Sequence, residues 1–161
     1  MKSAVQKWLC ALVVLAVLSG CGGKAPIILP PSPTVVRLHL AADAQINPDT
    51  KGRPTPVVVR YYLLSNPGVF ESADFFSLFD GDEKTLGATL VSREEVTLRP
   101  GQTLDAELKP QAEAKAIGVF VAYRDVNKSV WRASAAVPQN KTTNFSVAVK
   151  KDRVTIGSEA K

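Results

Sequence analysis

The run Val57-Val58-Val59-Arg60-Tyr61-Tyr62-Leu63-Leu64 is apolar on both faces of an extended strand. Residues 57, 59, 61 and 63 share one face, and residues 58, 62 and 64 share the other face with Arg60, because side chains alternate along a strand. A strand that is apolar on both faces is typical of a central position with cover on each side. We therefore expect a second sheet on one face and a further element on the other.

The segment that follows this strand is a candidate for that cover. Ser72 is a good N-cap residue and Gly81 can end a helix. Phe75 and Phe79 are four residues apart and align on one helical face. We predict a short helix that buries both phenylalanines on the sheet, with a ligand-binding aromatic patch as the alternative. We interpret Asp80-Gly81-Asp82-Glu83 as a turn, because it lacks the spacing of a calcium loop.

The rest of the chain alternates short apolar strands with turns. The expected strands are residues 34–41, 95–98, 103–108, 117–123, 130–135, 143–149 and 153–157, while residues 86–93 read as an irregular or short helical piece. Short strands with regular turn signals predict an all-β, antiparallel β-sandwich of about eight strands.

The N-terminus has the features of a lipoprotein signal. Lys2 and Lys7 precede an apolar run over residues 8–18, and Leu18-Ser19-Gly20-Cys21 ends it. A secretory signal peptide typically has a basic start, a short apolar segment and small residues before its cleavage site. The cysteine directly after the predicted cleavage site indicates an N-acyl diacylglycerol lipid on Cys21. We expect no other cofactor. An ordinary signal peptide is one alternative; a membrane-spanning anchor is another, but the run is shorter than the ~20 residues needed to span.

These features predict four parts of the chain: a signal peptide over residues 1–20, lipidated Cys21 with a Pro-rich tether over 21–33, a sandwich domain over 34–157, and a tail over 158–161. Prolines in the tether favour an extended form with a reach on the order of 30–40 Å. The absence of Asp after Cys21 favours the outer membrane, with the domain facing the periplasm. Cys10 leaves with the signal, so no pair of thiols remains for a disulfide.

Composition argues against several classes of function. The 161 residues carry a formal net charge of +5, and loss of Lys2 and Lys7 leaves +3. This charge is small, and no cluster of basic residues is evident in the sequence, so a nucleic-acid partner is not expected. No motif for a hydrolase, a phosphate loop or a metal site is present, and we do not expect an enzyme. His39, the single histidine, reads as an exposed strand residue.

Residues 42–55 form the longest irregular stretch of the domain, with turn chemistry around Pro48 and Gly52. Long loops on a rigid scaffold often carry function. Ile46 stands alone among polar residues near the expected tip, which makes it the best candidate for an apolar anchor. Two acidic and two basic residues balance within this loop, so we expect weak long-range electrostatic steering.

An ordered set of stretches carries a family resemblance. They are Ile46-Asn47-Pro48-Asp49, residues 52–60, Ala73-Asp74-Phe75-Phe76-Ser77-Leu78-Phe79, Leu86-Gly87, Leu98-Arg99-Pro100-Gly101 and Trp131-Arg132. Together with the lipoprotein signal, they resemble the outer-membrane lipoproteins of the type VI secretion system (TssJ, also called SciN or VasD-like). This resemblance implies a transthyretin-like β-sandwich with a small helical addition.

The resemblance also implies a function without catalysis. The family anchors and docks the periplasmic domain of the inner-membrane protein TssM in the secretion membrane complex, and the loop between its first two strands is linked to partner binding. Carried over here, the expected contacts are Gln45, Ile46, Asn47, Pro48, Asp49, Lys51 and Arg53. The alternative is a periplasm-facing lipoprotein that binds a glycan or small ligand, for which Trp131 and Tyr123 are the candidate aromatic pair.

Overall fold

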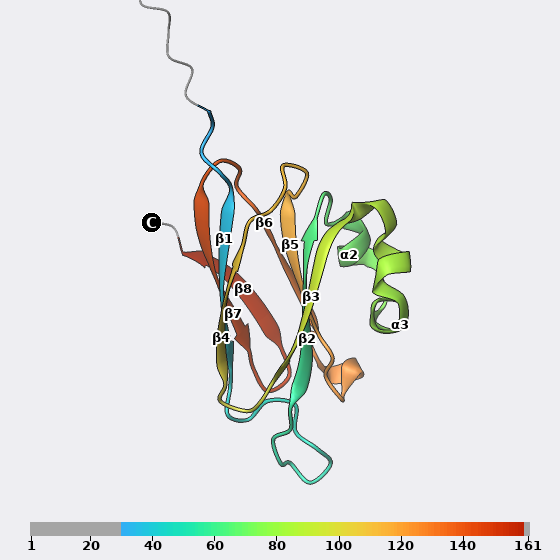
Figure 1. The fold of residues 1–161 in the computed structure, drawn as a ribbon. Helices are drawn as coiled ribbons and strands as arrows, with labels where there is room; N and C mark the ends of the chain where they lie inside the picture. Colours follow the sequence, from blue (N-terminus) through green and yellow to red (C-terminus); the bar gives the residue numbers. More distant parts are fainter. Residues whose placement is uncertain (1–29, 160–161) are drawn as a thin grey trace, which may run out of the picture. The chain divides into compact units, whose positions relative to one another are not determined.

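The computed structural model describes residues 30–159, so the predicted signal peptide, Cys21 and most of the predicted tether lie outside the described residues. Two four-stranded sheets pack face to face, and two helices lie on the outer face of one of them (Figure 1). The predicted eight-stranded sandwich with a helical addition is confirmed. Between residues 30 and 159, no helix has the length and apolar character needed to cross a membrane.

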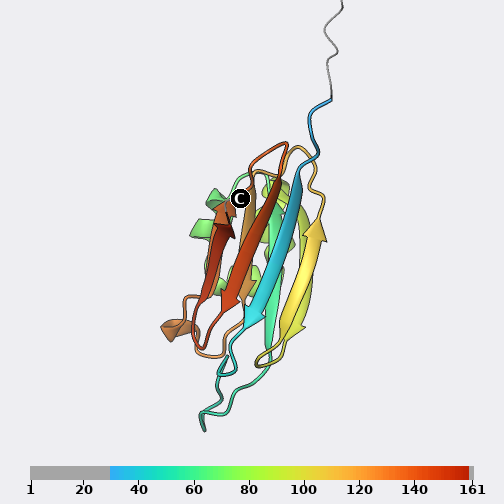
Figure 2. The ribbon, with the colours of Figure 1, turned by 90° about the vertical axis from the view of Figure 1, so that its left-hand side faces the viewer.

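Sheet A has the strand order β4-β1-β7-β8 and is seen face-on in Figure 2. Its strands are β1 Val35–Ala42, β4 Thr103–Leu108, β7 Thr142–Val149 and β8 Val154–Glu159. Neighbouring strands are antiparallel except β1 and β7, which run parallel from Val35 opposite Thr142 to Ala42 opposite Val149. This one pair departs from the antiparallel expectation, because alternation of apolar residues fixes the faces of a strand and not its direction.

Sheet B has the order β3-β2-β5-β6 and is antiparallel throughout. Its strands are β2 Val57–Leu64, β3 Leu90–Leu98, β5 Ala116–Val121 and β6 Arg132–Ala136. Val57, Val59 and Tyr61 of β2 belong to the main core between the sheets, whereas Tyr62 and Leu64 belong to a second core beneath the helices. The double cover predicted for this central strand is confirmed.

Two helices, α2 Gly68–Ser72 and α3 Phe75–Leu86, are followed by the 3-10 turn η1 Gly87–Thr89. The predicted helix start at Ser72 is wrong: Ser72 ends α2, and Asp74 caps α3 by accepting a hydrogen bond from the Ser77 amide (2.9 Å). Gly81 kinks α3 and does not end it, so residues 80–83 are not a separate turn. The helix ends at Gly87 instead, and β3 starts at Leu90, within the piece predicted to be irregular.

Only one of the two phenylalanines predicted to be buried is inside. Phe75 is 7% exposed, but Phe79 is 42% exposed, so the prediction for Phe79 is wrong. The buried line of α3 runs through Phe75, Leu78, Asp82 and Leu86. Phe79 lies beside that line, and its ring stacks on the Phe75 ring with centroids 5.7 Å apart.

A charged cluster fastens α3 to sheet B. The Asp82 carboxylate accepts hydrogen bonds from Arg93 Nε (2.7 Å) and the Tyr62 hydroxyl (2.8 Å). Arg60 donates to Glu95 (2.7 Å) and to the carbonyls of Leu78 and Phe79 (each 3.0 Å), which lie just before the kink at Gly81. The cluster therefore neutralises the buried Asp82 carboxylate and provides hydrogen-bond donors to two carbonyls beside the kink in α3.

Candidate functional site

Four loops meet at one end of the sandwich. They follow β1, β3, β5 and β7 and comprise residues 43–56, 99–102, 122–131 and 150–153, which we call the loop end. The chain joins the sandwich at the opposite end, where Pro31 to Thr34 lead into β1, and the β1–β2 loop projects furthest at the loop end (Figure 1). The site expected from the sequence therefore lies away from the N-terminal attachment.

Ile46 is not an exposed anchor. Its side chain is 0% exposed and belongs to the main core between the sheets. The loop turns inward at this point, and the Thr55 amide donates to the Ile46 carbonyl (3.2 Å), which ties the two arms of the loop together. The interpretation of Ile46 as a surface contact is therefore wrong, because the residue closes the end of the core.

Asn47 is the residue through which the β1–β2 loop is fixed to its neighbours. It is 5% exposed and adopts a left-handed backbone conformation with φ of 45°. Its side-chain amide donates to the Pro56 carbonyl (2.9 Å), and its side-chain oxygen accepts from the Arg124 amide (2.8 Å). Its own backbone amide donates to the Lys151 carbonyl (3.1 Å). Asn47 is thus a buried structural residue and not a surface contact.

Asp49 organises the tip of the loop. Its carboxylate accepts hydrogen bonds from the Lys51 amide (2.8 Å), the Arg53 amide (2.9 Å) and Arg53 Nε (2.8 Å). The bonds from the Arg53 backbone and side chain lower the pKa of Asp49, so the carboxylate is charged at neutral pH. Gly52 takes φ of 78°, which suits a residue without a Cβ. The tip is therefore ordered by its own short-range bonds.

The four loops form one connected surface. The Gly101 amide donates to the Asp43 carbonyl (3.2 Å), and the Val130 amide donates to the Asp152 carbonyl (2.9 Å). A hollow of about 310 Å³ lies among three of these loops; its lining includes Pro48, Lys128 and Lys151. Of the predicted contacts, Gln45, Lys51 and Arg53 are exposed and Pro48 and Asp49 are half-buried. These five remain predicted contacts, because their side chains reach the surface.

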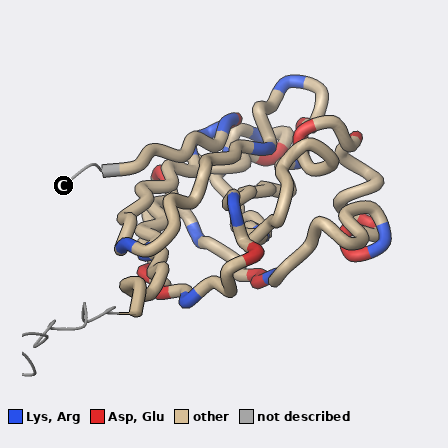
Figure 3. The backbone as a smooth tube through the Cα atoms, turned by 90° about the horizontal axis from the view of Figure 1, so that it is seen from above, with Lys and Arg blue, Asp and Glu red and all other residues tan. Residues whose placement is uncertain are grey.

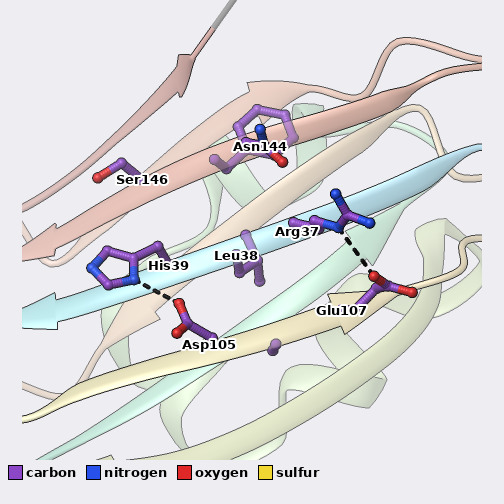
Figure 4. A pocket seen from close by; sticks show the side chains of 9 residues that line it. Arg37, Leu38, His39, Asp105, Glu107, Asn144 and Ser146 are labelled. Carbon is purple, nitrogen blue, oxygen red and sulfur yellow. Dashed lines mark hydrogen bonds and ion pairs between the residues drawn. The ribbon is translucent and has the colours of Figure 1, made fainter. Parts of the chain in front are cut away.

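The outer face of sheet A carries a second, shallow hollow lined by polar side chains (Figure 4). His39 lies 2.6 Å from Asp105, and Arg37 donates to Glu107 (3.1 Å), both across β1 and β4. The prediction that His39 is an exposed strand residue is confirmed, since its side chain is 52% exposed. Ser146 is its register neighbour on β7, but within the described chain no hydrogen bond joins the two side chains.

The aromatic pair proposed for a ligand site does not form one. Tyr123 is buried in the main core and donates its hydroxyl to the Lys150 carbonyl (2.9 Å). Trp131 packs edge-on against Phe75 and Phe120, with ring centroids 5.3 Å and 5.6 Å apart. Both rings are used in packing, which removes the support for the glycan-binding alternative. Among residues 30–159, no group of three or more His, Cys, Asp and Glu is placed to hold a metal ion.

A family model described as "Type VI secretion lipoprotein, VasD, EvfM, TssJ, VC_A0113" matches residues 34–152. The crystal structure of the type VI secretion lipoprotein TssJ1 from Pseudomonas aeruginosa is 31% identical, with a TM-score of 0.77, and the match covers 80% of this chain and 98% of that one. No curated protein matches the sequence.

Two further solved structures are similar. Lip from Serratia marcescens, a membrane-bound component of the type VI secretion system, is 25% identical with a TM-score of 0.73; the match covers 80% of this chain and 99% of that one. A chain in a structure of the TssM C-terminal domain from EAEC is also 25% identical, with a TM-score of 0.60 and the same coverage of 80% and 99%.

Proposed function

Because this chain belongs to the type VI secretion lipoprotein family, we propose that it is the outer-membrane lipoprotein of a type VI membrane complex and docks the periplasmic domain of the inner-membrane TssM component. In this role it is an anchor and a binding module without catalytic activity. The lipid on Cys21 is its one covalent group and holds it in the membrane, while the sandwich faces the periplasm.

The observation that carries this proposal is the placement of the two ends of the sandwich. The chain joins the sandwich at one end, and the β1–β2 loop projects from the other (Figure 1). A protein held at its N-terminus therefore presents this loop away from its own membrane. A partner that rises from the opposite membrane would meet the loop end first.

The order of the loop end supports a docking role. Asn47 connects the β1–β2 loop to two other loops, and Asp49 fixes its tip. A surface that is ordered before binding loses less conformational entropy on association, which leaves more of the contact energy for affinity. The similarity to a chain in a structure of the TssM C-terminal domain favours TssM as the partner.

The test is calorimetry of the full chain, solubilised in a non-ionic detergent, with the periplasmic fragment of TssM from the same organism. Thr50→Trp adds bulk at the exposed tip of the β1–β2 loop without changing charge. We expect it to weaken binding by about tenfold or more, since an interface packed at the density of a protein interior does not accommodate an extra ring. The melting temperature should stay close to that of the wild type.

Thr142→Trp is the matched control, because Thr142 is an exposed threonine at the start of β7, opposite Val35 and at the end of the sandwich away from the loop end. It should bind as the wild type does. Absence of binding by the wild-type chain would overturn the proposed partner. Equal affinity of both tryptophan variants and the wild type would remove the tip of the loop from the interface.

A further inference from the structure

The loop end is basic: residues 150–153 have a net charge of +2, residues 99–102 and 122–131 each have +1, and residues 43–56 are balanced. It carries eight basic residues, Lys51, Arg53, Arg99, Arg124, Lys128, Lys150, Lys151 and Arg153, and four acidic residues, Asp43, Asp49, Asp125 and Asp152. The β1–β2 loop by itself is balanced. The excess arises because the fold places the turns after β3, β5 and β7 beside it.

Local ion pairs remove most of the negative charge from this surface. Asp49 pairs with Arg53 (2.7 Å), Asp125 with Lys128 (3.2 Å) and Asp152 with Arg153 (3.4 Å). Five basic side chains at the loop end have no ion pair among residues 30–159: Lys51, Arg99, Arg124, Lys150 and Lys151. All five are exposed, so their charge is available to a partner.

The excess of positive charge is larger at this end than at the opposite one, whose turns carry Lys109, Lys115 and Lys141 against Glu113. The helical segment over α2 and α3 has the opposite balance, with Asp and Glu predominating along it (Figure 3). Its exposed acidic residues are Glu71, Asp74, Asp80 and Glu83, against the single base Lys84. The molecule therefore presents surfaces of opposite charge, and the basic one coincides with the projecting loops.

We infer that the loop end recognises an acidic protein surface on its docking partner and that this complementarity steers association. The inference rests on the proposed docking function and adds the chemistry of the partner. The hollow among the loops does not carry this charge, because Asp49, Asp125 and Asp152 line it together with Lys128 and Lys151. An acidic partner would instead meet the five exposed basic side chains that have no ion pair within the described residues.

Exposed complementary charges change the association rate constant more than the stability of the bound complex. Exposed charges act over about one Debye length, roughly 8 Å at physiological salt. Complementary patches raise the association rate constant and make it depend on salt, whereas exposed pairs add little to the stability of the bound state. This inference differs from the expectation of weak steering, which considered the charges of the β1–β2 loop alone.

The experiment measures association of the full chain, in non-ionic detergent, with the periplasmic fragment of TssM by stopped-flow fluorescence. Raising NaCl from about 50 mM to about 500 mM should lower the association rate constant by about tenfold or more. Lys150→Glu combined with Lys151→Glu reverses two of the five available charges. It should slow association at low salt by about tenfold and flatten the salt dependence.

The matched control is Lys109→Glu combined with Lys141→Glu. These exposed lysines lie at the opposite end of the sandwich, so the net charge of the protein changes equally while the loop end does not. This variant should associate at a rate within about twofold of the wild type. Lys150→Gln with Lys151→Gln adds no new acid, and it should show a smaller effect in the same direction.

The possible outcomes separate the inference from the proposed function. If the wild type does not bind the fragment, the docking proposal fails and the acidic partner fails with it. If the wild type binds at a rate that neither salt nor the loop-end variant changes, docking stands and the inference on charge is overturned. Equal slowing by both double variants would show a global charge effect and also overturn it. Binding to phosphatidylglycerol vesicles with no salt-dependent binding to the fragment would assign the basic surface to lipid instead.

Discussion

The side chain of Ile46 is fully buried although its neighbours in the sequence are polar. Those neighbours place their polar groups on the loop itself: Asn47 donates to Thr55 Oγ1 (3.1 Å), and Asp43 accepts from the Gln45 amide (3.0 Å). A loop that satisfies its own hydrogen bonds can fold over an apolar residue. The local pattern of the sequence carries no sign of this, because the partners are spread over several turns.

Ile46→Ala should therefore destabilise the domain. Removal of a fully buried isoleucine costs ~2–5 kcal/mol, from lost transfer free energy and the cavity left behind. The measurement is urea unfolding followed by tryptophan fluorescence. Lys51→Ala, at an exposed position of the same loop, should change the free energy of unfolding by less than about 0.5 kcal/mol. Similar unfolding midpoints for the two variants would contradict the burial of Ile46.

Among residues 30–158, Asp82 is the one buried acidic residue, with 7% of its surface exposed. Burial by itself would raise its pKa, but the hydrogen bonds from Arg93 and Tyr62 and the charges of Arg60 and Arg93 lower the pKa below its ordinary value. Arg60 and Arg93 lie 22 and 11 residues from Asp82 in the sequence. Apart from Arg60, an arginine in an apolar strand, nothing in the sequence signals that these groups meet.

Asp82→Asn should cost about 3 kcal/mol of stability at neutral pH, since it leaves the half-buried Arg60 and Arg93 without part of their counter-charge. Because the folded pKa is lower than the unfolded one, the charged form favours folding. This contribution is complete above the unfolded pKa of about 3.9 and is lost as the pH falls through the folded value.

Urea unfolding from pH 7 to pH 2.5 checks this (the limits are approximate). The difference between wild type and Asp82→Asn should be constant above about pH 5 and should shrink at the acid end. Other carboxylates with lowered pKa, such as Glu95, are present in both proteins and contribute similarly to each. A difference that stays constant down to the lowest pH would show that the charge of Asp82 is not what stabilises α3.

At the level of elements, strands were predicted better than helices. The bounds of β2 agree with the predicted Val57–Leu64, because an apolar run on both faces with turn residues at each end leaves little choice. The limits of α3 were missed, since Ser72 and Asp74 are both good caps and only packing decides between them. Propensity and capping patterns predict the presence of a helix more reliably than they predict its first and last residues.

The placement of α2 depends on one glycine. Phe70, the buried residue of α2, lies over Gly118 of β5, and a Cβ at residue 118 would lie 2.9 Å from the Phe70 ring. Gly118→Ala should displace α2 or force the ring from its position, at a cost of ~1–3 kcal/mol. The measurement is thermal unfolding together with the near-ultraviolet circular dichroism of the aromatic cluster.

Gly157→Ala in β8 is the control, because an added Cβ there meets nothing within 4 Å. This variant should melt close to the wild type and keep its aromatic spectrum. If Gly118→Ala behaves in the same way, α2 can shift freely, and the close contact with Phe70 does not fix the helix. Neither residue is at the loop end, so partner binding should survive in both variants.

The whole molecule has properties that no segment of the sequence displays. Strand order brings four loops to one end and gives that end its positive charge, whereas each loop read alone has a net charge of only 0 to +2. The sequence predicted the sandwich and the β1–β2 loop as the candidate site. It did not predict which residues of that loop are inside, because burial at the loop end depends on contacts with Arg124 and Lys151.

The arrangement of the two ends also makes membrane attachment and docking separable. In the proposed role, docking requires only the folded sandwich, whereas position in the cell requires the predicted lipid on Cys21. Each buried methylene of an acyl chain contributes ~0.8 kcal/mol, and two or more chains give stable attachment. Loss of the lipid should therefore remove the protein from the membrane without changing the docking surface.

Cys21→Ser tests this separation. The variant should remain uncleaved or unlipidated, leave the outer-membrane fraction and abolish type VI secretion in the host. Its purified form should still bind the periplasmic fragment of TssM with wild-type affinity, because residues 43–56 are unchanged. Cys10→Ser, the same substitution in the predicted signal peptide, is the control and should fractionate and secrete normally. Normal fractionation and secretion by Cys21→Ser would refute lipidation at this residue, and loss of binding by the purified variant would refute the independence of the two ends.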